Sequence, residues 1–372
     1  MPVSTLAADM TSPPRGAVAT APGPPGTGVH SALAQHRVHV VGAVCLDLVF
    51  AGLDTAPQPG TEVGASSLGL SPGGVANIAV ALARLGVDVG LSGVFASDAF
   101  GHYLWSTLEH EGIDLRSSVK VPDWTTPVTA SIAFACERSM VTYAEHPPVS
   151  ATSLLPAVGS VDAVVLSLGD VDVDLLERLH AGGRLVVADV AWDPDAHLTA
   201  GLRDKLALVD IFLPNAREAQ TYAGCDDVEA AAAALACESG LVVVKDGAAG
   251  ALAWDSSTGT SLRVPGLVVE ERDTTGAGDV FDAAFVYASL ERWPLAQRVR
   301  FANLCAAESV KHPGGSLAAP CWRDLGAFWN LLEDPSLRRA YSFLEPLLAT
   351  CPSHQACTRA CPSMSLPFHD VS

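Results

Sequence analysis

Short apolar runs alternate with helix-like segments between residues 161 and 246, and this alternation constrains the fold more than any other feature of the chain. Strand-length runs occur at residues 161–168, 185–188, 210–213 and 241–245. Helix-like segments occur between them, at residues 174–180 and 228–238. Strands that alternate with helices in this way form a parallel sheet with helices on both faces. The pattern therefore predicts a doubly wound α/β fold.

An acidic residue follows the first strand-like run of the chain, which we place at residues 38–44. Asp47 comes just past the expected carboxyl end of this run. In open α/β sheets ligands bind beyond the carboxyl ends of the strands, so Asp47 is a candidate to hold a substrate hydroxyl. The alternative interpretation is an ordinary acidic residue on a surface loop.

A pair of glycines opens the next helix, which the apolar pattern places at residues 78–85. Gly73 and Gly74 could bring the backbone close to a ligand, because no Cβ intervenes. Asn77 would add an amide at the start of the helix. A simple turn before a helix is the alternative.

Two further β-like runs, at residues 128–135 and 140–144, form a hairpin that no helix follows. Together with strand-like pieces between residues 47 and 70, they predict a small sheet that is separate from the main one. A small sheet over a site at the strand ends could act as a lid that excludes water.

The segment from Asp273 to Asp279 reads Asp-Thr-Thr-Gly-Ala-Gly-Asp, and an apolar run over residues 280–290 follows at once. That run predicts a buried helix. Residues 276–278 would then lie at a helix N-terminus, where free N–H groups and the helix dipole favour an anion. Asp279 beside such a site suits a general base that takes a proton from a hydroxyl attacking phosphorus. The alternative is that Asp279 only caps the helix.

Composition excludes several classes of protein. The formal net charge of -19 argues against a nucleic-acid partner and against an anionic membrane. The chain contains neither a P-loop nor a dinucleotide-binding glycine motif. We find no apolar run of transmembrane length and no secretory signal, and the nine cysteines form no CxxC pair. We therefore expect a cytoplasmic protein with reduced thiols.

Taken together, these stretches resemble the ribokinase/fructokinase (PfkB-type) family of carbohydrate kinases. Two motifs carry the resemblance: Gly73-Gly74-Val75-Ala76-Asn77 with the helix after it, and the highly specific segment from Asp273 to Asp279. The resemblance implies a ribokinase-like three-layer α/β/α sandwich with a central, mostly parallel sheet and a small β-sheet lid. It covers residues 37–321, with the lid at about 47–70 and 126–146. Outside it we expect a disordered extension (1–36), C-terminal helices (322–349) and a flexible tail (350–372).

The resemblance also implies roles for individual residues. Asp279 would be the catalytic base, and the backbone of Gly276, Ala277 and Gly278 would form an anion hole for the transferred γ-phosphoryl group. The substrate hydroxyls would be bound by Asp47, Gly73, Gly74 and Asn77.

On the nucleotide side, Asn215 and Glu218 match a pattern that positions magnesium and the phosphates, with Glu218 acting through water. The alternative for this pair is a capped helix start. The nucleotide loop would contain Lys245, Asp246, Gly247 and Gly250, and Asn303 would lie beside the adenine. Asp273 and Thr275, with the loop at Gly314 and Gly315, lie where some members of the family bind a monovalent cation.

The implied reaction is ATP-dependent transfer of a phosphoryl group to a primary hydroxyl of a small unphosphorylated sugar that resembles fructose or ribose. Val75 stands where relatives that act on phosphorylated sugars carry a cation, which favours an unphosphorylated acceptor. A nucleoside is the alternative substrate, and a catalytically silent sugar-binding regulator is the alternative from another class. The implied cofactors are ATP and Mg²⁺, with K⁺ for some members, and a homodimer through the lid sheet is a further expectation.

Overall fold

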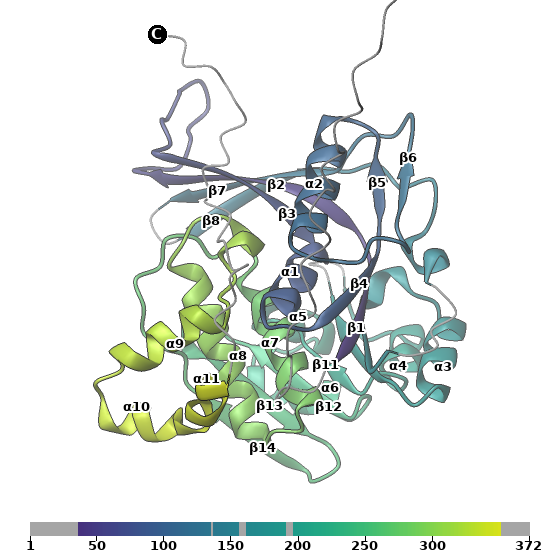
Figure 1. Cartoon of the computed structure of the whole chain (residues 1–372). Helices are drawn as coiled ribbons and strands as arrows, with labels where there is room; N and C mark the ends of the chain where they lie inside the picture. Colours follow the sequence, from purple (N-terminus) through teal and green to yellow (C-terminus); the bar gives the residue numbers. More distant parts are fainter. Residues whose placement is uncertain (1–35, 135–136, 156–160, 191–195, 351–372) are drawn as a thin grey trace, which may run out of the picture.

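An eight-stranded sheet forms the centre of the computed structural model, which describes residues 36–134, 137–155, 161–190 and 196–350 (Figure 1). Its strand order is β14-β13-β12-β11-β10-β9-β1-β4. The strands are β1 (Arg37–Val41), β4 (Asp88–Ser92), β9 (Ala163–Ser167), β10 (Leu185–Asp189), β11 (Ile211–Phe212), β12 (Leu241–Lys245), β13 (Ala251–Asp255) and β14 (Thr260–Val264). Neighbours from β4 to β12 are parallel, and the β13–β14 hairpin adds an antiparallel edge.

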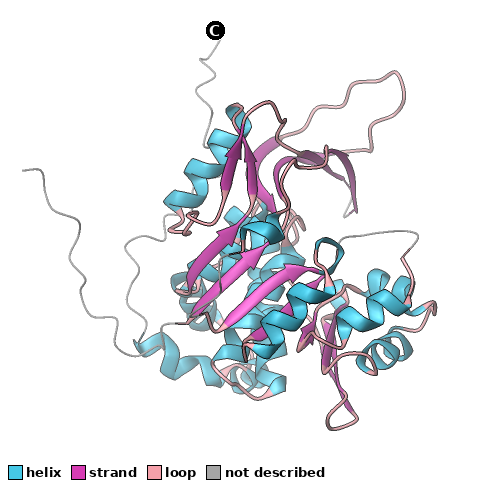
Figure 2. Cartoon of the chain, turned by 90° about the vertical axis from the view of Figure 1, so that its right-hand side faces the viewer, coloured by secondary structure: helices cyan, strands magenta, loops and turns pink. Residues whose placement is uncertain are grey.

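Helices cover both faces of this sheet, because successive side chains of a strand point to opposite faces. In β9, Val165 packs into one core and Val164 into the other. The first core is covered by α1 (Ala76–Arg84), α2 (Ala99–His110), α7 (Ala277–Leu290) and α8 (Leu295–Val310). The second is covered by α3 (Val173–Ala181), α4 (Ala200–Leu206), α5 (Ala216–Ala223) and α6 (Val228–Ala236). The predicted three-layer sandwich is confirmed (Figure 2).

A second sheet of four strands lies across the top of Figure 1 and has the order β3-β2-β7-β8. Its strands are β2 (Val44–Leu53), β3 (Ser67–Gly74), β7 (Val128–Phe134) and β8 (Glu137–Tyr143). A third pairing joins β5 (Val94–Ala96) to β6 (Val119–Val121). The four-stranded sheet is called the small sheet below.

The prediction for the first strand was wrong at its carboxyl end. β1 stops at Val41, and the chain turns at Gly42, whose φ of 155° favours glycine. A Cβ on Gly42 would lie 2.6 Å from the Val75 side chain. The chain then enters the small sheet, so Asp47 lies within β2 and not in a loop beyond the main sheet.

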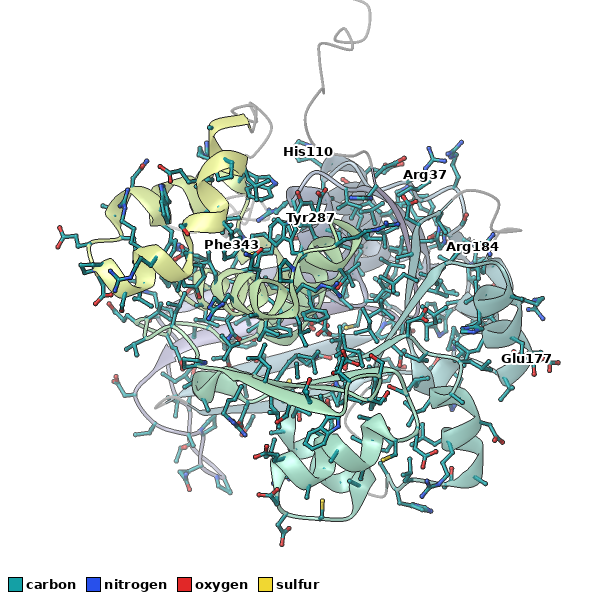
Figure 3. All side chains as sticks on the ribbon, turned by 90° about the horizontal axis from the view of Figure 1, so that it is seen from below. Arg37, His110, Glu177, Arg184, Tyr287 and Phe343 are labelled. Atoms are coloured by element: carbon teal, nitrogen blue, oxygen red, sulfur yellow. The ribbon has the colours of Figure 1, made fainter. Side chains whose placement is uncertain are left out.

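After residue 321, the described residues form the helices α9 (Trp322–Leu331), α10 (Pro335–Ala340) and α11 (Glu345–Thr350). Aromatic rings join this segment to α7 and α8. The ring of Trp322, at the start of α9, lies 5.7 Å from that of Tyr287 on α7 and 5.7 Å from that of Phe301 on α8. The ring of Trp293, between α7 and α8, lies 5.9 Å from that of Tyr287 and 5.4 Å from that of Phe343. Figure 3 labels Tyr287 and Phe343. The predicted disordered extension (1–36) and the predicted flexible tail (350–372) lie outside the described residues, except for residues 36 and 350.

Two features bear on the expected location of the protein. Within the described ranges, no helix is both long enough and apolar enough to cross a membrane. Cys45, Cys225, Cys237 and Cys305 are free thiols, whereas Cys321 is disulfide-bonded, so the expectation of reduced thiols throughout was wrong at that position.

Candidate active site

The start of α7 presents the predicted anion site. Gly276 precedes the helix in the left-handed conformation, with φ of 73°. A Cβ there would lie 3.4 Å from the Asn77 amide and from the Gly315 backbone, which is van der Waals contact, so it is the left-handed conformation that favours glycine. The first N–H groups of a helix have no partner within the helix. Gly278 supplies such a group, the Ala277 N–H donates to the Thr274 carbonyl oxygen at 3.3 Å just before the helix, and Asp279 follows in the first turn.

Asp279 is half-buried and accepts a hydrogen bond of 2.9 Å from Asn77 Nδ2. Burial raises the pKa of this carboxyl to about 7, and the negative charge of Asp189 adds to the effect. The Lys245 ammonium and the Asn77 amide act in the opposite direction, because both stabilise the ionised form. A carboxylate with a pKa near neutrality can both accept and release a proton in this pH range.

Lys245 lies directly beneath the anion site. Its Nζ donates to Asp282 at 2.8 and 2.9 Å and to Asp189 at 3.2 Å. A Cβ on Gly278 would lie 3.6 Å from the same Nζ. Lys245, predicted for the nucleotide loop, therefore supports the amino end of α7 from below.

The sequence analysis assigned no role to Asp189 or Asp282. Asp189 ends β10, and an acidic residue at a strand end was a usable signal. Asp282 is fully buried one turn after Asp279, within a helix that is otherwise apolar. A charged residue in such a helix also signals a buried partner, here Lys245.

Asp189, Asp279 and Asp282 place carboxylate oxygens within 4.8 Å of one another, close enough for a metal ion. The Lys245 ammonium already supplies a cation to two of these three residues. Four carboxylates surround this one ammonium, since Glu218 also lies close enough to feel its charge. The cluster therefore keeps excess negative charge. Burial raises the pKa of Asp279 and Glu218 to about 7, and the negative charge of Asp189 adds to the effect.

Three of the residues predicted to bind substrate, Asp47, Gly73 and Gly74, meet where β2 and β3 pair. Asp47 is 6% exposed, and a Cβ on Gly73 would lie 2.5 Å from its carboxylate oxygens. A Cβ on Gly74, with φ of 64°, would lie 2.3 Å from the Ala43 carbonyl oxygen. The two glycines therefore make room for Asp47 and for the backbone. The charge of Asp47 also raises the pKa of Asp279, so the two acids lie in the same site.

Asn77, predicted as a substrate ligand, is only 3% exposed. Its amide nitrogen donates to Asp279, and its amide oxygen accepts from Ser316 N at 3.1 Å. The structure thus places the Asn77 side chain against Asp279.

Asn215 and Glu218 form a capping box at the start of α5. Asn215 Oδ1 accepts from Glu218 N at 2.9 Å, and Glu218 Oε2 accepts from Asn215 N at 2.8 Å. This geometry is the alternative that the sequence pattern left open. It engages one oxygen of Glu218, which is buried beside Asp189.

The predicted nucleotide loop follows β12. Asp246 accepts from Arg263 at 2.9 Å, and Gly247 begins a short 3₁₀ turn. Gly250 has φ of 92°, and a Cβ there would lie 2.1 Å from the Val264 carbonyl oxygen. Asn303 on α8 donates to the carbonyl oxygens of Val264 and Pro265, both at 3.2 Å. Asn303 therefore holds the chain that packs against Gly250, and a contact with adenine stays a prediction.

Asp273 is buried and accepts hydrogen bonds from three backbone N–H groups. Its Oδ1 accepts from Thr275 at 2.9 Å, and its Oδ2 accepts from Gly314 at 2.9 Å and from Gly315 at 3.4 Å. The Thr275 hydroxyl lies 3.2 Å from that of Ser131 in the small sheet. Because both oxygens of Asp273 are engaged, this arrangement fits a structural role better than a monovalent cation site.

A cavity of about 780 Å³ lies at the other end of the sheet, where β9, β10 and β11 begin. Its lining includes Arg184 (Figure 3), Asp210 and Arg292. The helices α3 and α7 end there, and basic side chains at helix C-termini complement the helix dipole. It is separate from the cluster around Asp279.

Comparison with solved structures agrees with this architecture. Arabidopsis thaliana ribokinase complexed with ribose and ATP superposes with a TM-score of 0.65 at 21% identity, over 78% of this chain and 98% of that one. The fold is therefore that of the ribokinase-like proteins.

Residues 35–321 match the pfkB family of carbohydrate kinases, so the chain belongs to that family and is an ATP-dependent phosphotransferase. A ribokinase from Bacillus subtilis is 30% identical over 74% of this chain and 93% of its own length. A nucleoside kinase from Methanothermobacter thermautotrophicus is 26% identical over 75% of this chain and 91% of its own length.

Proposed function

We propose that this protein transfers the γ-phosphoryl group of ATP to a primary hydroxyl of a small unphosphorylated sugar that resembles ribose or fructose. One observation carries the proposal: a half-buried carboxylate, Asp279, has a pKa of about 7 and follows directly after the first N–H groups of α7. A base and an anion-binding helix end are thus adjacent, as attack of a hydroxyl on phosphorus requires.

In the proposed reaction the acceptor oxygen forms a bond to the γ-phosphorus while the bond from that phosphorus to the bridging oxygen breaks. ADP leaves with the bonding electrons, and the hydroxyl proton passes to the Asp279 carboxylate. The N–H groups of Gly276, Ala277 and Gly278 stabilise charge on the equatorial oxygens. Lys245 adds positive charge beneath Gly278.

The acidic cluster fits a nucleotide that arrives with a divalent cation. Glu218 and Asp189 carry the excess negative charge that such a cation would neutralise, and Glu218 would hold Mg²⁺ through water. Magnesium would neutralise charge on the β- and γ-phosphates.

Two acids at the acceptor end favour an unphosphorylated substrate. Asp47 and Asp279 lie in the same site, and a phosphorylated sugar would add negative charge to it. Val75 begins α1 without adding a cation there. The similarity to a nucleoside kinase keeps a nucleoside as the second candidate, because its ribose presents a similar set of hydroxyls.

The test is ATP consumption by the purified protein with a panel of sugars and nucleosides, starting with D-ribose, D-fructose and adenosine. We expect turnover with at least one member of the panel. Asp279→Asn should lower kcat by about 10²- to 10⁴-fold, the usual contribution of a general base. Asp88→Asn is the matched control, because it removes an exposed carboxylate that pairs with Arg37 far from the site.

Near-full activity of Asp279→Asn would show that the base assignment is wrong. Tight binding of a panel member without turnover by the wild type would favour the silent regulator.

A further inference from the structure

We propose that Arg84 is a positioning residue for Asp279 and acts on it through the bracing segment, residues 314–319, and through Asn77. The bracing segment contains a 3₁₀ turn at Gly315–Ala318. This inference rests on the proposed role of Asp279 as the base. It assigns a function to a buried ion pair that the reaction itself does not use.

The Ser316 N–H fixes which end of the Asn77 amide faces Asp279. An amide can face Asp279 with either its NH₂ group or its oxygen. The oxygen accepts from Ser316 N at 3.1 Å, so the NH₂ group must face Asp279, to which it donates at 2.9 Å. The reversed amide would set its oxygen against a carboxylate and its NH₂ group against an N–H. At 3% exposure, water has little access to compensate those losses.

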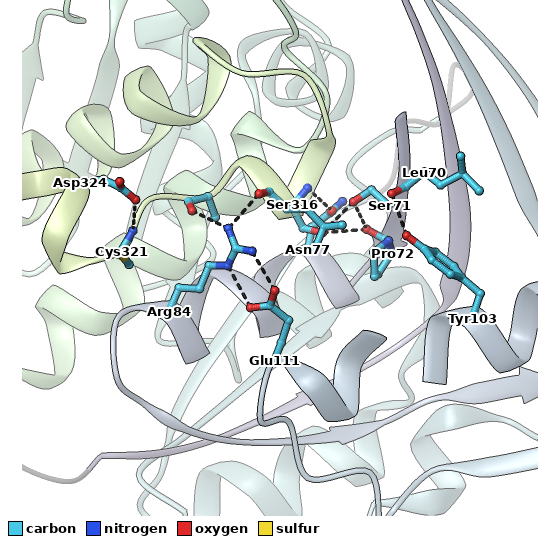
Figure 4. Close-up of polar contacts among 12 residues, drawn as sticks. Leu70, Ser71, Pro72, Asn77, Arg84, Tyr103, Glu111, Ser316, Cys321 and Asp324 are labelled. Carbon is cyan, nitrogen blue, oxygen red and sulfur yellow. Dashed lines mark hydrogen bonds and ion pairs between the residues drawn. The ribbon is translucent and has the colours of Figure 1, made fainter. Parts of the chain in front are cut away.

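Contacts of the Ser316 side chain with β3 hold Ser316 N in place. Ser316 is fully buried, and its hydroxyl donates to the Pro72 carbonyl oxygen at 2.9 Å and lies 3.0 Å from the Ser71 hydroxyl (Figure 4). These contacts join the bracing segment to the strand that carries Gly73. Ser316 therefore links the acceptor side of the site to the amide that faces the base.

Arg84 holds the bracing segment immediately after Ser316. One terminal guanidinium nitrogen donates to the carbonyl oxygens of Leu317 and Ala319, both at 2.9 Å. The remaining two nitrogens donate to the Glu111 carboxylate at 2.8 and 2.9 Å (Figure 4). The pair is buried, so water and salt screen its electrostatic attraction only weakly. The planar guanidinium of arginine can donate to a carboxylate along one edge and to two carbonyl oxygens from its remaining nitrogen, whereas the single ammonium of lysine cannot.

The consequence for Asp279 has a definite sign. Donation from Asn77 stabilises the ionised carboxylate and lowers its pKa. If the bracing segment moves, Ser316 N no longer fixes the amide, and this donation weakens. The pKa of Asp279 then rises, and the acidic limb of the kcat–pH profile moves to higher pH. A merely structural role of Arg84 would lower stability and leave the limb where it is.

The experiment compares the pH dependence of kcat and the thermal unfolding of four proteins: wild type, Asn77→Leu, Arg84→Gln and the double variant. The assay uses ATP with the acceptor that the panel identifies, D-ribose first. Asn77→Leu should move the acidic limb of the kcat–pH profile to higher pH by roughly one unit, which corresponds to the loss of one hydrogen bond to a charged group. Arg84→Gln should raise it in the same direction, and the double variant should shift no further than Asn77→Leu.

Trp322→Phe is the matched control. Trp322 Nε1 donates to the Leu85 carbonyl oxygen at 2.9 Å, next to Arg84 in sequence, but it makes no hydrogen bond to Leu317 or Ala319. Its loss should lower the unfolding temperature without moving the limb.

An Arg84→Gln limb that coincides with the wild type, or a double variant with the sum of the two shifts, would overturn the inference. If Arg84→Gln does not fold, Glu111→Gln takes its place, because it removes the charge that holds the Arg84 guanidinium. An acidic limb that stays at the wild-type pH in Glu111→Gln would also overturn the inference. Failure of the proposed function is distinguishable, because it would appear as near-full activity of Asp279→Asn or as no turnover of the panel by the wild type.

Discussion

At the scale of single residues, one lysine balances a group of acids. Asp189 raises the pKa of Asp279, Glu218 and Asp282, while Lys245 lowers all three. Each of these carboxyls lies close to the others because they come from a strand end, a helix start and one helix face. The protonation state of Asp279 is therefore a property of the cluster and not of this residue alone.

We predict that kcat falls as the pH drops below about 7, because Asp279 must be ionised to accept a proton and its pKa is about 7. Lys245→Met removes the ammonium that lowers this pKa, so the acidic limb should move to higher pH and kcat at pH 7 should fall. The kcat–pH profiles of both proteins check this. An unmoved limb in a folded Lys245→Met variant would contradict the charge assignment.

At the scale of elements, the start of α5 combines a local and a long-range role. The capping box of Asn215 and Glu218 is complete within four residues of chain. The raised pKa of Glu218 has a distant cause, since burial and Asp189 produce it. Capping alone does not require an acid such as Asp189 beside Glu218, so the pairing of the two acids points to a second role.

Glu218→Gln separates these roles, because glutamine can complete the same capping box without the charge. We expect thermal stability close to that of the wild type, together with a severalfold higher KM for magnesium-ATP. Asn215→Ala is the comparison, and loss of its cap should cost about 1 kcal/mol of stability. An unchanged KM in Glu218→Gln would mean that the residue only caps the helix.

At the scale of the whole molecule, the small sheet exposes apolar side chains on its two outer strands. Leu68 on β3 and Met140, Val141 and Tyr143 on β8 are each at least half exposed. Water-exposed apolar side chains gathered on one sheet favour association. The expected homodimer through the small sheet stays a prediction.

Light scattering after size exclusion tests this prediction at micromolar concentrations. The wild type should elute as a dimer, and Val141→Glu should shift it toward the monomer, because a charge would be buried without a partner. Val268→Glu is the control, since Val268 is fully exposed outside the small sheet and should not affect association. A wild type that is monomeric under these conditions would contradict the prediction.

Local patterns determined most of the architecture. Strand and helix periods, the glycines at residues 73, 74 and 276, and the capping residues are all readable within a few positions, because backbone conformation depends on near neighbours. The apolar run after Asp279 predicted a buried helix, and α7 is one. The strand break at Gly42 was missed, because the apolar pattern continues through it while the chain changes sheet.

The chemistry of the site was decided by tertiary structure. Asn77 meets Asp279 across 202 positions, and Arg84 meets Leu317 across 233. Burial and neighbouring charges of both signs set a pKa through space, and neither is encoded in sequence spacing. The sequence by itself determined that a carboxylate stands at the start of a buried helix; only the fold decided that Asn77, Lys245 and Asp189 surround it.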